Sequence, residues 1–227
     1  MAMGPLTWDE TGERLYETGT KQGVLYVMTD EGKYGDGVAW NGLTAVTESP
    51  SGAEETALYA DDIKYLSLRS AEEFGATIEA YTYPDAWGEC DGSVDLAPGV
   101  SIGQQSRKAF GFCFRSVQGN DVKGNDYGYK LHLVYNATAS PSERAYATIN
   151  DSPEAITFSW EVTTNPINVA GHKPTAHLVI DSATLLKDAK GAAKLKAIED
   201  KLYGTTTTSP TLPLPGEILQ ILEDAEA

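Results

Sequence analysis

An alternation of apolar and polar residues with a period of two runs through this chain and restricts the folds open to it. Between residues 156 and 162, the apolar side chains of Ile156, Phe158, Trp160 and Val162 are separated by single polar residues. Successive side chains of a β-strand point to opposite faces, so this segment predicts an antiparallel strand with one face on a core. Trp160 falls on the apolar face and is expected to be a core residue.

The same pattern recurs often enough to predict a mainly β fold. Clear repeats lie at residues 110–114, 129–135 and 176–180, and weaker ones at residues 23–29, 38–47, 58–70 and 76–83. Seven or eight strands separated by turn residues favour an antiparallel β-sandwich or barrel. A polar, glycine-bearing hairpin tip is expected at residues 119–126, and a short helical turn at residues 83–87. The length of 227 residues suits one large domain with appendages.

Two segments near the C-terminus have helical character. Residues 188–203 carry Leu195, Ile198 and Leu202 on one stripe, and Gly204 is placed as a stop, which predicts a helix flanking the sheet. We therefore divide the chain into a β-sandwich domain, residues 1–204, and a C-terminal arm, residues 205–227.

The arm begins with threonines and prolines and ends in a short acidic amphipathic segment, residues 217–227. Eleven residues are too few for a stable isolated helix. We expect the apolar side chains of the arm to contact a neighbouring subunit. These candidates are Leu212, Leu214, Ile218, Ile221 and Leu222.

A long hairpin is expected at residues 44–71, joined through the polar turn at residues 48–55. Its strands lack one obvious core face, which suggests that they are buried on another subunit; an ordinary edge hairpin is the alternative. The candidate contact residues of this assembly hairpin are Pro50, Leu58, Tyr59, Ile63 and Tyr65.

The charge balance and the cysteines limit the partners and the compartment. Seventeen Lys and Arg against 33 Asp and Glu leave a net charge of −16, which argues against wrapping nucleic acid. An acidic soluble protein kept dispersed by its charge explains the number equally well. Two cysteines, Cys90 and Cys113, are expected to be reduced thiols in a cytosolic setting, with a disulfide between them as the less favoured alternative. No signal peptide and no membrane span is expected.

A search for catalytic or metal-binding patterns is negative. His132 and His177 lie on the polar side of alternating strands, where solvated or hydrogen-bonded histidines are expected. Acidic pairs at residues 54–55, 61–62 and 72–73 are adjacent on strands and so do not face each other across a cleft. We therefore expect no enzyme activity, no cofactor and no metal.

Several segments together resemble the major tail (tail tube) proteins of long-tailed bacteriophages that infect Gram-positive bacteria. The matching segments are residues 42–53, 58–62, 73–84, 98–105 and 150–161, and the Leu-Pro-Leu-Pro arm is similar as well. The resemblance covers residues 4–203 and implies a β-sandwich with a flanking helix. It also implies homo-hexameric rings stacked into a tube, through which the genome passes into the host without specific binding.

Further expectations come from this resemblance alone. The partners would be other copies of the chain and other tail proteins, namely the tape measure, tail terminator and distal tail proteins, with no membrane. The location would be the virion tail, assembled in the host bacterial cytoplasm. An acidic inner wall would weaken adhesion of DNA. The candidate lumen-facing acids are Asp61, Asp62, Glu72, Glu73 and Glu79.

Three alternatives stay open from the sequence. An acidic sandwich-type glycosidase would need convergent carboxylates, for which no pattern is present. A carbohydrate-binding sandwich or adhesin could use tryptophans as sugar platforms. Another virion component, such as a capsid decoration or tail-tip protein, would share the sandwich and the acidity.

Overall fold

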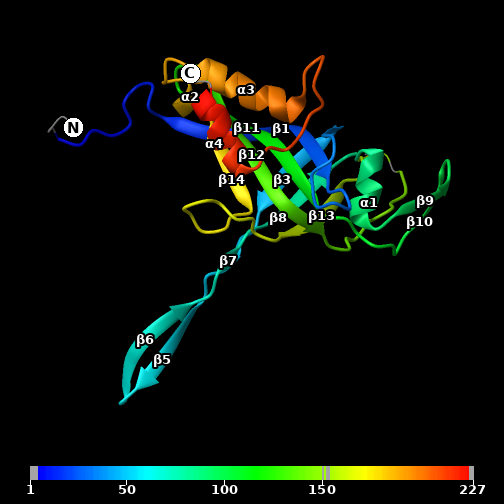
Figure 1. Ribbon diagram of the computed structural model, residues 1–227, viewed down its shortest axis with the longest axis horizontal. Helices are drawn as coiled ribbons and strands as arrows, with labels where there is room; N and C mark the ends of the chain where they lie inside the picture. The colour runs from blue at the N-terminus through cyan, green and yellow to red at the C-terminus, as the bar shows by residue number, and fades with distance from the viewer. Residues whose placement is uncertain (1–4, 150, 152–153, 225–227) are drawn as a thin grey trace.

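A computed structural model of the chain describes residues 5–149, 151 and 154–224, and it contains one large curled antiparallel sheet (Figure 1). Among the described residues this sheet has eight strands. In spatial order they are β2 (Val38–Trp40), β1 (Leu15–Val27), β11 (Phe110–Asn120), β12 (Gly124–Ala139), β13 (Phe158–Thr164), β8 (Gly75–Ala80) and β3 (Leu43–Glu48), with β14 (His177–Asp181) paired to β12. The expectation of a mainly antiparallel β-sandwich with few helices is confirmed.

Three two-stranded ribbons and several short helices complete the fold. The ribbons are β4 (Ser51–Gly52) with β7 (Glu72–Glu73), β5 (Glu55–Ala60) with β6 (Ile63–Arg69), and β9 (Val94–Ala97) with β10 (Val100–Ile102). The helices are η1 (Asp85–Trp87), α1 (Gly88–Asp91), α2 (Ser182–Leu185), α3 (Gly191–Tyr203) and α4 (Pro215–Asp224). The expected helical turn at residues 83–87 thus corresponds to η1.

The strand β12 connects two parts of the sheet because it bends near its end. Residues 130–134 of β12 pair with β14, whereas residues 137–139 pair with β13. At the bend Asn136 has a φ of 47°, a left-handed conformation that asparagine tolerates better than most residues. The pairing with β11 shifts register at the same place. This bulge redirects the strand and lets the sheet curl around its inner core.

The concave face of the sheet encloses an aromatic core. Trp40, Trp87 and Trp160 pack with ring centroids 4.6–5.5 Å apart, and Phe110 and Phe112 contact the group edge-on. Trp160 is 1% exposed, so its expected core position is confirmed. The alternation that predicts β13 is also present in the structure, since Glu161 is exposed between buried Trp160 and Val162.

The convex face of β1, β11 and β12 is also buried, contrary to the expectation of half-buried strands. Helix α3 covers it with Leu195, Ile198 and Leu202, as the stripe on this helix predicts. The strand side of this second core includes Tyr26, Cys113, Leu131, Leu133 and Tyr135. Helix α3 begins at Gly191 rather than at residue 188, because residues 186–190 form a turn after α2. A Cβ at Gly191 would lie 2.0 Å from the carbonyl oxygen of Leu185.

The C-terminal arm packs on its own chain, which corrects the expectation that its apolar residues are free for a neighbour. Leu212 and Ile218 are 4% exposed and belong to the second core, and Ile221 and Leu222 pack against it. Leu214 is 45% exposed. Figure 1 shows the arm and α4 beside α3 over the sheet. The last three residues of the arm, 225–227, lie outside the described residues, as do residues 150 and 152–153 of the matching segment 150–161.

Candidate assembly surface

The hairpin β5–β6 projects away from the body of the molecule on a narrow stem (Figure 1). The stem consists of two pairs between β4 and β7, Ser51 with Glu73 and Gly52 with Glu72. Two backbone hydrogen bonds continue it, from Ala53 to Ala71 and from Ser70 to Glu54. The expected long hairpin at residues 44–71 is present in its outer part, where β5 pairs with β6 and most of the side chains are exposed. The expected turn at residues 48–55 is wrong, because these residues end β3 and form the stem, β3 pairs with β8 in the main sheet, and the chain turns at Asp61 and Asp62.

The register of the hairpin places apolar side chains on one face. The pairs Thr56–Leu68, Leu58–Leu66 and Ala60–Ile63 alternate with the pairs Glu55–Arg69, Ala57–Ser67 and Tyr59–Lys64. A register shift between Leu58 and Tyr59 keeps Ile63 on the side of Leu58 and Leu66. We call this side, formed by Thr56, Leu58, Ala60, Ile63, Leu66 and Leu68, the apolar hairpin face. The sequence pattern hides it, because the bulge interrupts the alternation.

The opposite face of the hairpin is charged and internally paired. The Glu55 carboxylate accepts hydrogen bonds of 2.5 Å from Lys64 and from Ser67, and Arg69 lies 3.5 Å away. The bonds from Lys64, Ser67 and Arg69 lower the pKa of Glu55, although the carboxylate stays open to solvent. This face pairs its own charges, although it also exposes Tyr59. The apolar side chains of the apolar hairpin face are exposed in the described part of the monomer.

The tip of the hairpin is a two-residue turn at Asp61 and Asp62. Both residues have positive φ, 51° and 63°, as a tight turn between twisted strands requires. The expected contact residues Leu58, Tyr59, Ile63 and Tyr65 are all exposed here. Pro50, also expected to be a contact, is exposed between β3 and the stem.

The candidate lumen-facing acids fall on three different parts of the chain. Asp61 and Asp62 lie at the hairpin tip, and Glu72 and Glu73 lie in the stem. Glu79 is partly buried on the convex side of β8, because its neighbours Ile78 and Ala80 point into the aromatic core. The structure thus does not gather these acids into one cluster.

A second exposed ribbon, β9–β10, was not predicted from the sequence. Its strands are exposed throughout and carry Val94, Leu96, Val100 and Ile102. The turn contains Gly99 with a φ of 77°. The alternation of Val94 with Leu96 before a Pro-Gly pair is the signal that indicates this ribbon.

Few of the tryptophan side chains are accessible to a carbohydrate. Trp40, Trp87 and Trp160 are buried in the aromatic core, and among the four, all of which the structure describes, Trp8 alone is exposed. A sugar platform needs an aromatic face open to solvent. The structure therefore removes three of the four side chains on which a carbohydrate-binding interpretation depends.

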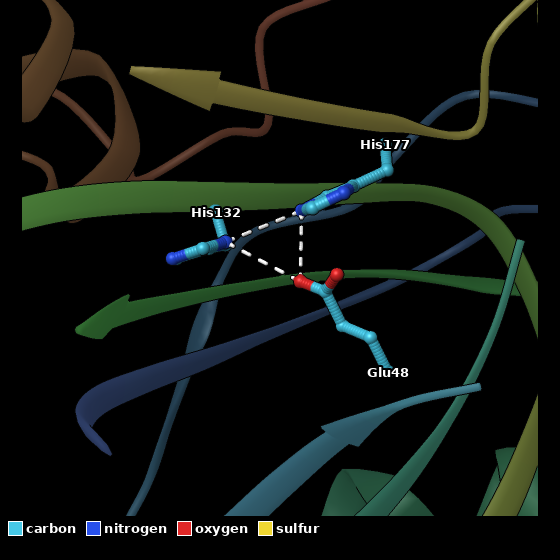
Figure 2. A group of neighbouring side chains, drawn as sticks. All are labelled: Glu48, His132 and His177. Carbon is cyan, nitrogen blue, oxygen red and sulfur yellow. Dashed lines mark hydrogen bonds and ion pairs between the residues drawn. The ribbon is translucent and has the colours of Figure 1, made fainter. Parts of the chain in front are cut away.

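Two histidines and a glutamate meet at the end of the aromatic core (Figure 2). His132 Nδ1 lies 3.3 Å from His177 Nε2, and one carboxylate oxygen of Glu48 lies 3.7 Å from each of these nitrogens. His132 is 8% exposed and lies on the inner side of β12, parallel to the Phe114 ring at a centroid distance of 4.5 Å. Of the two expected environments, solvated or hydrogen-bonded, the structure shows the second, because β12 is covered on both faces and His132 bonds to Ser116 and His177.

Burial keeps both imidazoles neutral. Desolvation, followed by the neighbouring His177, lowers the pKa of His132 to about 4, despite the opposing charge of Glu17. Desolvation also lowers the pKa of His177, and Glu48 opposes the shift. Ser116 Oγ lies 2.9 Å from His132 Nε2, and the Phe74 ring packs on His177 at 4.5 Å. These contacts hold both rings in place.

Comparison with known proteins shows distant structural similarity and no match in sequence. No family model matches the sequence, and no curated protein matches it. Among solved structures, the chain is similar to a chain of the sheath–tube complex of an extracellular contractile injection system, PVC, in its extended state. The identity is 12%, the TM-score is 0.31, and the match covers 70% of this chain and 88% of that chain. A similarity this distant carries no argument about function.

In the part of the chain that the structure describes, no helix combines the length and the apolar character that crossing a membrane requires.

Proposed function

We propose that this chain is a structural subunit that assembles with copies of itself into stacked, hexameric rings of a tail tube, and that it is not an enzyme. The apolar hairpin face carries the proposal. Leu58, Ile63, Leu66 and Leu68 are exposed on a ribbon that stands clear of the body. We propose that a neighbouring subunit covers them in the assembly.

The physical reason is that an isolated two-stranded hairpin is marginally stable in water. Within the described residues its apolar face stays exposed, since the narrow stem holds it away from the body. Contiguous exposed apolar side chains of this kind mark interaction sites. A second copy of the chain is the partner that fits best, because every copy in a symmetric assembly presents the same ribbon in an equivalent position.

The acidity of the chain fits a conduit for DNA. With a net charge of −16, the chain has few cationic side chains to neutralise phosphates. DNA that passes along such a surface would therefore not adhere to it. We propose that part of the acidic surface, among Asp61, Asp62, Glu72, Glu73 and Glu79, faces the bore. The virion tail would then be the site of action, and the tape measure, terminator and distal tail proteins would be further partners.

The proposal is tested by electron microscopy and sedimentation velocity of the purified full-length chain over a range of concentrations. Rings or tubes with a central bore are expected, at a mass that is a multiple of six subunits. A protein that stays monomeric at every concentration and binds glycans would contradict the proposal and favour the carbohydrate-binding alternative.

A further inference from the structure

We propose that Glu48, His132 and His177 form a binding site for a divalent transition-metal ion, for which zinc is the best match. The site goes beyond the proposed function and stands independently of it. It also departs from the expectation that the chain has no metal site, because the three residues are far apart in the sequence and follow no ligand-spacing motif.

The distances between the ligand atoms support the proposal. The three separations are 3.3, 3.7 and 3.7 Å. A tetrahedral zinc ion binds nitrogen and oxygen at about 2.0–2.2 Å, which places neighbouring ligand atoms about 3.3–3.5 Å apart. One point therefore lies about 2.1 Å from all three atoms, so an ion fits without a shift of the strands.

The two rings point their nitrogens toward each other. Their planes are 10° apart and their centroids are 5.5 Å apart, whereas the facing nitrogens are only 3.3 Å apart. The two rings therefore lie nearly edge to edge, and Glu48 approaches the gap from one side (Figure 2). Both facing nitrogens can bind an ion on the Glu48 side of this gap when each ring tilts toward the carboxylate.

The chemistry of the ligands also fits. Two neutral imidazoles and a carboxylate form a common ligand set for zinc at sites that keep a fourth position open. Ser116 contacts the remaining nitrogen of His132 at 2.9 Å, the kind of outer contact that orients a ligating histidine. The Glu48 side chain is 42% exposed, which gives an ion a path from solvent and leaves room for a water.

The position of the site suggests what the ion would do. Its ligands come from β3, β12 and β14, and Glu48 is the last residue of β3 before the stem of the hairpin. A bound ion would fasten the root of the hairpin to the sheet. Metal binding would then stabilise the folded chain and restrict the orientation of the hairpin.

The experiment uses the full-length chain, first treated with EDTA, and measures zinc binding by calorimetry and thermal unfolding with and without zinc chloride. The wild type is expected to bind one equivalent of zinc and to unfold at a higher temperature when zinc is present. Cobalt(II) in place of zinc should give the absorption of a four-coordinate ion.

Matched variants locate the site. Glu48→Gln and His177→Gln should each lower the zinc affinity by more than about 100-fold, since each removes a ligand. The controls His172→Gln and Glu161→Gln change exposed residues outside the cluster and should bind like the wild type. Glu48→Gln is expected to fold normally because its side chain is open to solvent. No zinc binding by the wild type, or equal binding by Glu48→Gln and the wild type, would overturn the proposal.

Discussion

The hydroxyl of Tyr135 donates a hydrogen bond of 3.0 Å to the carbonyl oxygen of Pro213, and this buried bond joins strand β12 to the C-terminal arm. Two further bonds fix the arm, from the Gly37 amide to Pro210 and from the Thr211 amide to Lys201, each 2.8 Å long. The arm is therefore part of the fold of its own subunit. The Leu-Pro-Leu-Pro sequence, which looks like a free linker, in fact closes the second core.

The first prediction concerns this arm. Leu212→Ala should lower the free energy of unfolding by about 2–5 kcal/mol, because the side chain is buried in the second core, where it lies close to Gly111 of β11. Leu214→Ala, two residues away and largely exposed, should cost less than about 1 kcal/mol. Urea unfolding measures both. Equal, small losses in the two variants would show that the arm is not packed as described.

The second prediction concerns the contact between α3 and the sheet. Glu199 pairs with Arg115 and accepts a hydrogen bond of 2.6 Å from the Tyr129 hydroxyl, while the Arg115 guanidinium lies 3.5 Å from the Tyr129 ring centre. Glu199→Gln leaves a partly buried guanidinium without its counter-charge. We expect a loss of about 1–3 kcal/mol in the free energy of unfolding.

The control for this network lies on the same helix. Lys196 and Asp200 form an exposed ion pair, so Asp200→Asn should change the free energy of unfolding by less than about 0.5 kcal/mol. A second measurement follows the Tyr129 phenol. Burial, and then the bond to Glu199, raise its pKa to about 12, so its ionisation should shift to lower pH in Glu199→Gln.

The third prediction concerns the thiols. Cys90 lies in the aromatic core and Cys113 in the second core, on opposite faces of the sheet, and both are free. Their places in two separate cores agree with two unpaired thiols and disfavour the alternative of a Cys90–Cys113 disulfide. Desolvation, reinforced at Cys90 by Glu89 and Asp91, raises the pKa of each thiol to about 12. Neither should react with a thiol reagent at pH 8 until the protein is denatured.

The raised pKa values of the two thiols also determine how the free energy of unfolding depends on pH. Above pH 9 the unfolded chain releases thiol protons that the folded chain retains, so the free energy of unfolding falls as the pH rises. At pH 10 each thiol contributes a loss of about 2 kcal/mol relative to neutral pH. Replacement of both cysteines by alanine should reduce the fall of the free energy of unfolding between pH 8 and 10. The fall that remains comes from buried tyrosines such as Tyr26, Tyr135 and Tyr203, whose pKa values are also raised. An unchanged slope would contradict the burial of the thiols.

The sequence predicts the elements whose environment is simple. Strand β13 has one buried and one exposed face, so its alternation predicts the strand correctly. The apolar stripe of α3 likewise contacts a single surface. Strand β12 is harder because both of its faces are buried, which hides His132 among apparently polar positions. The bend at Asn136, which carries β12 from one neighbour to the other, depends on a backbone conformation that periodicity does not encode.

The sequence likewise predicts some features of the hairpin and of the C-terminal arm and misses others. The hairpin follows from strands without one core face, but its turn lies at Asp61 and Asp62 and not in the polar stretch at residues 48–55, which forms the stem. Its amphipathic character depends on a bulge between Leu58 and Tyr59, which the pattern does not reveal. The composition of the arm resembles a linker and so predicts contact with a neighbour. Its burial depends on residues distant in sequence, such as Tyr135, which bonds to Pro213 from 78 positions away.

The most direct test of the account compares the two faces of the β5–β6 hairpin. Leu58→Ser combined with Leu66→Ser removes the paired centre of the apolar hairpin face, and Ala57→Ser combined with Lys64→Gln changes two positions of the opposite face. Sedimentation velocity and electron microscopy then measure assembly. We predict that the first double variant stays a folded monomer, whereas the second assembles like the wild type. Assembly of both variants into the same particles as the wild type would contradict the central claim.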